Sequence, residues 1–170
     1  MESLPAPLDR ETAAAQGPAD HKAELKLWLR LLTCSTLIEN GIRKRLRDAF
    51  DVTLPRFDLM AQLEKAPIGM TLGELSRRMM VSNGNITAIV EALVMQGLLD
   101  RTPVPHDRRA QRVTLTAEGR KLFRTMASAH EGWIAEIFED LSASETGELM
   151  TLLARTKASA RKAFGGGETP

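Results

Sequence analysis

The sequence lacks the features that mark secreted and membrane proteins. It contains one cysteine, Cys34, which cannot form a disulfide within the chain. No run of about 18 apolar residues occurs, so we expect no membrane-spanning helix. Residues 1–20 have neither the basic start nor the apolar core of a secretory signal. These absences together predict a cytoplasmic protein.

Motifs for metal binding and catalysis are also missing. The three histidines, His21, His106 and His130, are far apart, and together with Cys34 they give no metal-ligand spacing. The sequence contains no Gly-x-Ser-x-Gly, no phosphate-binding loop and no His-Glu-x-x-His. We therefore expect no metal, no cofactor and no enzymatic activity.

The charge is nearly balanced overall but unevenly distributed. The 170 residues carry a net charge of +1, which by itself does not indicate nucleic acid. Residues 71–116 hold six arginines and no lysine against four acids, which gives +2. Arginine is suited to forked contacts with phosphate and to insertion into DNA grooves. The pattern fits either a nucleic-acid surface or a solvated surface of mixed charge.

Hydrophobic periodicity predicts long helices at both ends of the chain. Residues 20–52 carry an apolar stripe at spacings of three and four, and its members are Leu27, Leu31, Cys34, Ile38, Ile42 and Leu46. Residues 117–164 are expected to form two more helices, the second beginning at a capping box from Ser142 to Glu145. Residues 1–19 are predicted to form a flexible arm and residues 165–170 a disordered tail.

The middle of the chain has the pattern of a helix-turn-helix. A helix begins at Thr53-Leu54-Pro55, with proline in its first turn. Thr71 and Glu74 form a capping box for a short second helix. Ser82 is an N-cap for a third helix, which Gly97 ends. Two helices joined by three or four residues are typical of this motif.

A β-hairpin is predicted to follow the third helix. Residues 98–102 and 111–115 are strand-like, and the intervening segment 103–110 is charged and rich in proline, which argues against a regular strand there. The predicted fold is therefore mainly α. Residues 53–116 form a winged helix-turn-helix with one small hairpin as its wing, and the terminal helices form a dimerisation frame.

The third predicted helix has a nearly bare side opposite its apolar face. Gly84 and Ala88 lie on this side, flanked by Asn85 and Thr87. Small residues permit deep entry into a major groove, and short amide and hydroxyl side chains reach base edges. The helix N-terminus at Ser82-Asn83 favours phosphate. A surface helix with an ordinary polar face would show the same pattern.

The wing carries arginines at its predicted tip. Such arginines can enter a minor groove, where the negative potential is high. Asp107 can hold Arg109 or Arg112 in place through a charge-assisted hydrogen bond. A surface salt bridge of little energetic value is the alternative.

Several motifs of this region follow one another in a fixed order. They are Thr71-Leu72-Gly73-Glu74-Leu75-Ser76, Asn85-Ile86-Thr87, Gly97-Leu98-Leu99 with Arg101, and Asp107-Arg108-Arg109 followed by Val113-Thr114-Leu115-Thr116. In these motifs residues 53–120 resemble the MarR family of bacterial transcription regulators. The resemblance implies a homodimeric repressor that binds a palindromic operator in double-stranded DNA. It assigns the wing contacts to Asp107 and Arg109 and the major-groove contacts to Ser82, Asn83, Asn85 and Thr87. We predict further DNA contacts from Ser76, Arg77, Arg101, Arg108 and Arg112.

The resemblance also implies a small aromatic effector, bound between the frame and the winged lobe. The candidate ligand residues are Trp28, Leu32, Thr36, Asn40, Arg43, Lys44, Arg47, Phe57 and Met60. Trp28 and Phe57 suit a flat acyl group, and the cations at residues 43–47 suit phosphates. We therefore predict an aromatic acyl-CoA such as p-coumaroyl-CoA, which would control aromatic-acid catabolism. The alternative ligands are a free aromatic acid and a drug-like phenolic. A further alternative is that these side chains on the first helix bind no ligand and only border the dimer interface.

Two other readings remain open. Redox sensing through Cys34 is disfavoured because we expect this thiol to be buried in the apolar stripe, and buried thiols are usually inert. The resemblance also implies that redox-sensing relatives pair the cysteine with tyrosines, and this chain has no tyrosine. A DNA-architectural protein without an effector would bind DNA without a preferred operator.

Overall fold

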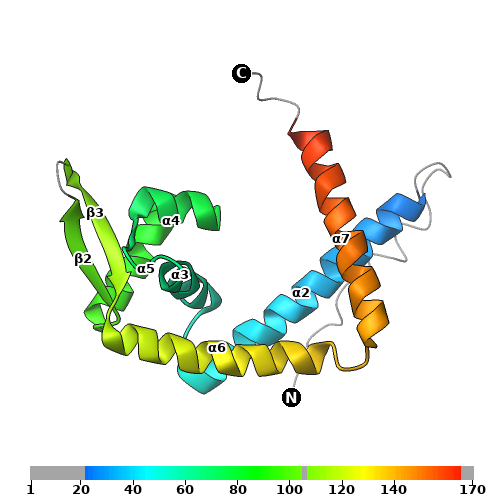
Figure 1. Ribbon diagram of the computed structural model, residues 1–170, viewed down its shortest axis with the longest axis horizontal. Coiled ribbons are helices and arrows are strands. Elements are labelled where there is room, and N and C mark those ends of the chain that lie inside the picture. The colour runs from blue at the N-terminus through cyan, green and yellow to red at the C-terminus, as the bar shows by residue number, and fades with distance from the viewer. Residues whose placement is uncertain (1–21, 105–106, 166–170) are drawn as a thin grey trace, which may run out of the picture. The chain divides into compact units, whose positions relative to one another are not determined.

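Six helices and three strands occur in residues 22–104 and 107–165, the part of the chain that the computed structural model describes (Figure 1). They are α2 (Lys22–Phe50), α3 (Leu54–Glu64), β1 (Met70–Thr71), α4 (Leu72–Met79), α5 (Asn83–Met95), β2 (Leu99–Val104), β3 (Asp107–Leu115), α6 (Ala117–Ile137) and α7 (Ala143–Phe164). The chain divides into two units, residues 1–129 and 130–170, with the boundary inside α6. The predicted arm at residues 1–19 and the tail after Gly165 lie outside the described residues.

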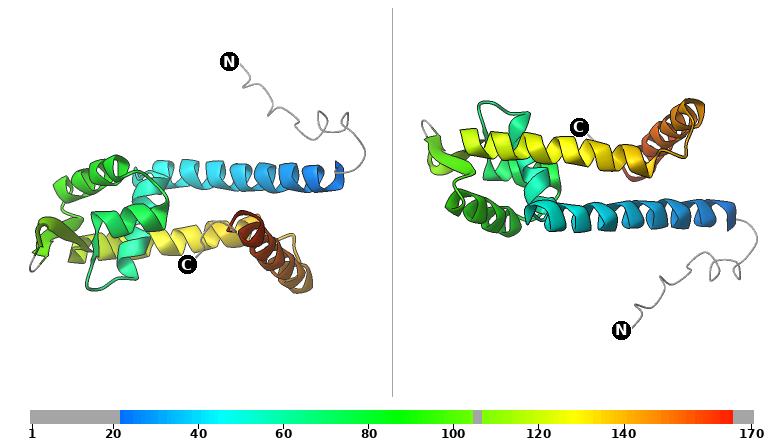
Figure 2. Two further views of the ribbon diagram at one scale, coloured as in Figure 1. Left: turned by 90° about the horizontal axis from the view of Figure 1, so that it is seen from above. Right: turned by 90° about the horizontal axis from the view of Figure 1, so that it is seen from below.

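Helix α2 is one unbroken helix (Figure 2). Its apolar stripe is buried only near its C-terminal end. Ile42 and Leu46 are 3% and 0% exposed, because α3 packs against this end, whereas Leu27 is 54% exposed. Cys34 is exposed as well. The prediction that its thiol is buried is therefore wrong for the single chain. None of the described helices is long and apolar enough to cross a membrane.

Helices α3, α4 and α5 share one apolar core. Pro55 stands in the first turn of α3, as predicted, although the Thr53 side chain makes no capping hydrogen bond. The side chains that form this core are Phe57, Leu59, Met60, Leu63, Leu75, Ile86, Val90 and Leu93. Burying such a side chain contributes about 1.5–3 kcal/mol. The three helices therefore form one lobe in which α5 packs through its buried face.

Three antiparallel strands form a sheet in the order β1-β3-β2. Only the hairpin of β2 and β3 was predicted, because β1 has two residues and gives no sequence pattern. Met70 of β1 pairs with Val113 of β3. The preceding Gly69 has a positive φ of +78°, and a Cβ at this position would lie 2.5 Å from the Val113 carbonyl oxygen. Glycine is thus required for the close approach of β1 to β3.

The wing strands are longer than predicted. We expected a turn over residues 103–110, but β2 continues to Val104 and β3 begins at Asp107. Pro103 is tolerated because β2 is an edge strand, and the pairing becomes irregular between Pro103 and Val104. Residues 105–106 lie outside the described residues.

The first part of α6 is fastened to the lobe. The Phe57 and Phe123 rings lie 5.6 Å apart between centroids, and Met126 is fully buried. Arg120 Nη1 and Arg124 Nε lie 3.6 and 3.4 Å from the two carboxylate oxygens of Glu64 at the end of α3. These contacts give α6 a fixed start beside β3.

The second unit contains the end of α6 and the whole of α7. Helix α7 begins at the predicted capping box of Ser142 and Glu145 and ends at Gly165. No residue of α7 is buried. Its apolar side chains Leu149, Leu152 and Leu153 are all exposed.

Candidate nucleic-acid interface

The capping box of α4 fixes the entry into the helix-turn-helix. The Thr71 backbone N–H and hydroxyl donate to Glu74 Oε2 at 2.7 and 2.9 Å, and Glu74 N–H donates to Thr71 Oγ1 at 3.3 Å. The backbone bond from Thr71 is the main cause that lowers the pKa of Glu74, followed by the Thr71 hydroxyl and the charges of Arg112 and Arg77. The box thereby anchors α4 at the end of β1.

The turn between α4 and α5 is set by Ser76. Its hydroxyl donates to the Val81 carbonyl at 2.6 Å, and Val81 N–H donates to the Ser76 carbonyl at 3.2 Å. Met80 between them has a left-handed backbone with φ of 54°. The hydroxyl proton of Ser76, a predicted DNA contact, is thus donated to the Val81 carbonyl within the protein, and this bond positions α5.

The N-terminal end of α5 is open to solvent. Ser82 caps the helix by accepting a bond from Asn85 N–H at 3.4 Å, as the sequence predicted. Asn83, Gly84 and Asn85 are exposed, and no atom lies within 4 Å of a Cβ placed on Gly84. The half-buried Thr87 donates its hydroxyl to the Asn83 carbonyl at 2.9 Å. The predicted strip of Gly84 and Ala88, flanked by Asn85 and Thr87, is therefore present on the surface.

The wing arginines have different surroundings. Arg112 Nη1 donates to the Gly69 carbonyl at 2.9 Å, which ties β3 to the start of β1. Arg101 pairs with the buried Val113 in the sheet, and its Nε and Nη2 are buried with no hydrogen-bond acceptor among the described residues. Arg112 is thus part of the wing's framework, whereas the DNA contact predicted for Arg101 stays a prediction.

Of the remaining predicted contacts, the structure describes the side chain of Arg77 only. Arg77 is exposed in the last turn of α4. Arg78 is exposed beside it, although it was not among the predicted DNA contacts. Its position at the end of a helix, shortly before the N-cap Ser82, is the sequence feature that could have indicated a phosphate contact. The side chains of residues 107–110 lie outside what the structure describes. The pairing of Asp107 with Arg109 and the placement of Arg108 therefore stay predictions.

The predicted effector residues do not gather into one site in the described part of the first unit. Trp28, Thr36, Asn40 and Arg47 are exposed on α2, and Leu32 is half-buried. Arg43 pairs with Glu39 and Lys44 with Asp48 on the same helix. The charge available for phosphate is thereby reduced.

Two predicted effector residues lie in the core. Phe57 is 7% exposed and packs on Phe123, and Met60 is fully buried. They cannot line an open cleft in this structure, because the same apolar spacing that suggested a ligand face is the core face of α3. The effector contacts predicted for Phe57 and Met60 therefore have no support in the described single chain.

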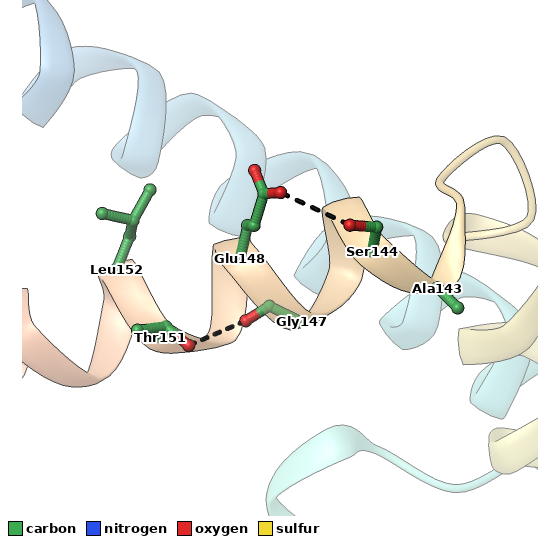
Figure 3. Close-up of a pocket in the computed structure, with 6 residues that line it drawn as sticks. All are labelled: Ala143, Ser144, Gly147, Glu148, Thr151 and Leu152. Carbon is green, nitrogen blue, oxygen red and sulfur yellow. Dashed lines mark hydrogen bonds between the residues drawn. The ribbon is translucent and has the colours of Figure 1, made fainter.

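The surface also has two hollows that lie along α7. One is lined by Ala143, Ser144, Gly147, Glu148, Thr151 and Leu152, all from this single helix (Figure 3). The second continues along the same helix from Leu152 to Ala163. A hollow with one helix as its only wall encloses no ligand, so neither matches the predicted effector site.

Known proteins match both the sequence and the fold. Residues 52–110 match the model of the MarR family. The transcriptional activatory protein BadR of Rhodopseudomonas palustris is 27% identical over 141 residues, 80% of each chain. A MarR family transcriptional regulator from Silicibacter pomeroyi is 27% identical with a TM-score of 0.72, over 84% of this chain and 99% of that one. A mutant MarR from E. coli, complexed with operator DNA, shares the fold at 24% identity with a TM-score of 0.68, over 81% and 99%.

Proposed function

We propose that this chain is a MarR family transcriptional regulator and that it binds a palindromic DNA operator as a homodimer. The observation that carries the proposal is the N-terminal end of α5. Ser82, Asn83, Gly84 and Asn85 are all exposed there. They follow a turn that Ser76 fixes, and the three-stranded sheet that contains the wing belongs to the same unit. The solved operator complex of a mutant E. coli MarR with the same fold supports this reading.

The lobe suits entry of α5 into a major groove. The absence of side-chain bulk at Gly84 lets the backbone come close to the base edges, where Asn83 and Asn85 supply amide donors and acceptors. Arg77 and Arg78 are exposed at the end of α4 and are suited to phosphate. The wing arginine Arg109 would enter the adjacent minor groove. Base contacts select the sequence, and phosphate contacts supply most of the affinity.

Dimerisation follows from the uncovered apolar faces. Leu27 and Trp28 on α2, and Leu152 and Leu153 on α7, are between 42% and 57% exposed in the single chain. Exposed apolar faces of this kind mark sites of association. A two-fold dimer presents two copies of α5, so the operator half-sites should lie about 10 base pairs apart.

Footprinting and light scattering test this proposal together. We expect a dimer in solution and one protected palindrome on DNA at a salt concentration that suppresses non-specific binding. A monomer, or protection without a preferred sequence, would contradict the proposal. Protection without sequence preference would instead favour the architectural reading.

The finer proposal is a repressor that an aromatic acyl-CoA, such as p-coumaroyl-CoA, releases from DNA. It is supported by the exposed Trp28, Thr36, Asn40 and Arg47 on α2, which combine an aromatic ring, two polar groups and a cation. Release requires the ligand to prefer a dimer whose recognition helices do not match the operator spacing. The relative BadR is described as an activatory protein, so the sign of regulation needs its own test in a promoter reporter.

Calorimetry with p-coumaroyl-CoA, the free acid and CoA alone decides the ligand. We expect the thioester to bind and to dissociate the operator complex, and the free acid to do little. Arg47→Ala should weaken the thioester response more than it weakens DNA binding. Tight binding of the free acid with no gain from CoA would replace the thioester with a free aromatic acid.

A further inference from the structure

The exposed side of α5 contains one charged residue. At about 100° per residue, Gly84, Ala88, Glu91 and Met95 fall within about 60° of one another around the helix axis. All four are exposed, and they lie opposite the buried Ile86, Val90 and Leu93. Glu91 is the sole charged residue in the thirteen of α5. The side of the helix offered to DNA thus carries an acid and no cation.

Glu91 has no structural task in the described part of the chain. Its side chain forms none of the ion pairs or side-chain hydrogen bonds found there. The residues three and four positions away on α5 are Ala88, Thr87, Val94 and Met95, which offer no cation. Glu91 also stands beyond the first turn, where the helix dipole would stabilise a carboxylate. Its presence is therefore not explained by helix stability.

A carboxylate on this side of α5 meets an unfavourable field near DNA. The phosphates repel it, so its presence weakens binding unless a hydrogen-bond donor compensates. The donors on base edges in the major groove are the exocyclic amino groups of cytosine and adenine. Adenine has an acceptor nitrogen beside its amino group, which repels a carboxylate, whereas the edge of cytosine has none. Cytosine is thus the base that suits Glu91.

The neighbours of Glu91 allow it to reach a base. Ala88 precedes it by one turn and Gly84 by two, so no long side chain separates this side of the helix from the groove floor. Met95 follows by one turn and is 89% exposed. Its apolar side chain and the Ala88 methyl suit contact with thymine methyl groups.

We propose that Glu91 is a specificity-determining residue that accepts a hydrogen bond from the exocyclic amino group of a cytosine in each operator half-site. This inference rests on the proposed DNA-binding function. Glu91 is not among the DNA contacts predicted from the sequence. The inference also predicts which base the half-site contains.

Selection from a randomised half-site, followed by measured affinities for all four base pairs at each position, tests the proposal. Wild type should prefer C·G at one position per half-site by about 5- to 150-fold, the range of one base-specific contact. Glu91→Ala should reduce this preference to near onefold and leave the preferences at other positions unchanged. Glu91→Gln should shift the preference at the same position towards adenine, because an amide bonds the adjacent donor and acceptor of that base.

The control separates readout from simple charge removal. Glu131→Gln removes one exposed acid from α6 and should change no base preference. If Glu91→Ala and Glu91→Gln tighten binding equally at every sequence, Glu91 acts only by repulsion and the inference is overturned. If wild type itself shows no preferred sequence, the proposed function fails, and the inference fails with it.

Discussion

At the residue scale, the arginines of the wing differ in what they bind. One guanidinium N–H of Arg112 donates a hydrogen bond to the Gly69 carbonyl. The charge of Arg112 also contributes to the lowered pKa of Glu74. Arg112 therefore connects β3, β1 and the start of α4. Arg109, with a side chain outside the described residues, remains the predicted minor-groove residue. One side chain supports the interface, and the other is expected to touch DNA.

Salt dependence should distinguish these two arginines. Arg109→Ala should weaken operator binding and lower the slope of log affinity against log salt by about one, because a phosphate-neutralising charge is lost. Arg112→Ala should weaken binding through a misplaced wing and leave the slope unchanged. Fluorescence anisotropy across a salt series gives both slopes. A lower slope for Arg112→Ala as well would place Arg112 on phosphate.

The lowered pKa of Glu74 should make stability depend on pH. Because the folded pKa lies below the ordinary value of about 4.3, the charged carboxylate stabilises the fold above that value. This stabilisation is lost as pH falls through the lowered pKa. Glu74→Gln keeps a capping side chain but should cost about 0.5–1 kcal/mol at pH 7. The deficit should shrink below pH of about 4. Urea unfolding at one protein concentration measures it, and an equal deficit at both pH values would contradict the assignment.

At the scale of the element, the turn between α4 and α5 holds a side chain in an unfavourable backbone conformation. Met80 is 92% exposed and has a φ of 54°. A left-handed conformation costs a non-glycine residue about 1–2 kcal/mol, and an exposed side chain repays little by packing. The bonds between Ser76 and Val81 hold the turn in place. The turn that orients α5 thus contains backbone strain at Met80.

Glycine at this turn should stabilise the protein. Met80→Gly removes the left-handed strain but increases the entropy of the unfolded chain, so we expect a net gain of about 0.5–1 kcal/mol. Met80→Ala is the matched control, because it removes the same exposed side chain and keeps a Cβ. Thermal unfolding at a fixed protein concentration compares the two. A gain for alanine as large as that for glycine would show that strain is not the cause.

At the scale of the whole molecule, the described chain has more apolar surface than it can cover. Helix α7 has no buried residue, and Leu27 and Trp28 near the N-terminal end of α2 are more than half exposed. A helix of 22 residues in water derives most of its stability from packing of an apolar face. We therefore expect the terminal helices to be stable only in the proposed dimer.

A polar substitution on α7 should dissociate this dimer. Leu153→Lys places a charge on the exposed apolar side and should shift the protein to a monomer that binds the operator more weakly. Leu153→Met keeps apolarity and volume and should remain dimeric. Light scattering with circular dichroism measures mass and helix content together. An unchanged mass for Leu153→Lys would remove this face of α7 from the interface.

The sequence by itself determined the local features, because their hydrogen bonds join residues a few positions apart. The capping boxes at Thr71 and Ser142, the N-cap at Ser82 and the proline at the start of α3 were all predicted and confirmed. The apolar spacing within α5 likewise predicted its buried face. The order of these elements was enough to predict a mainly helical fold with a hairpin wing.

Only the tertiary structure decided which segments meet. It added β1, extended the wing strands through Pro103, and placed Phe57 and Met60 in the core rather than at a ligand cleft. Arg112 finds its acceptor 43 residues away at Gly69, a distance that no local spacing reveals. Cys34 is exposed because the lobe covers only the end of α2. Periodicity shows which side of a helix is apolar, but the neighbour that covers that side depends on long-range packing.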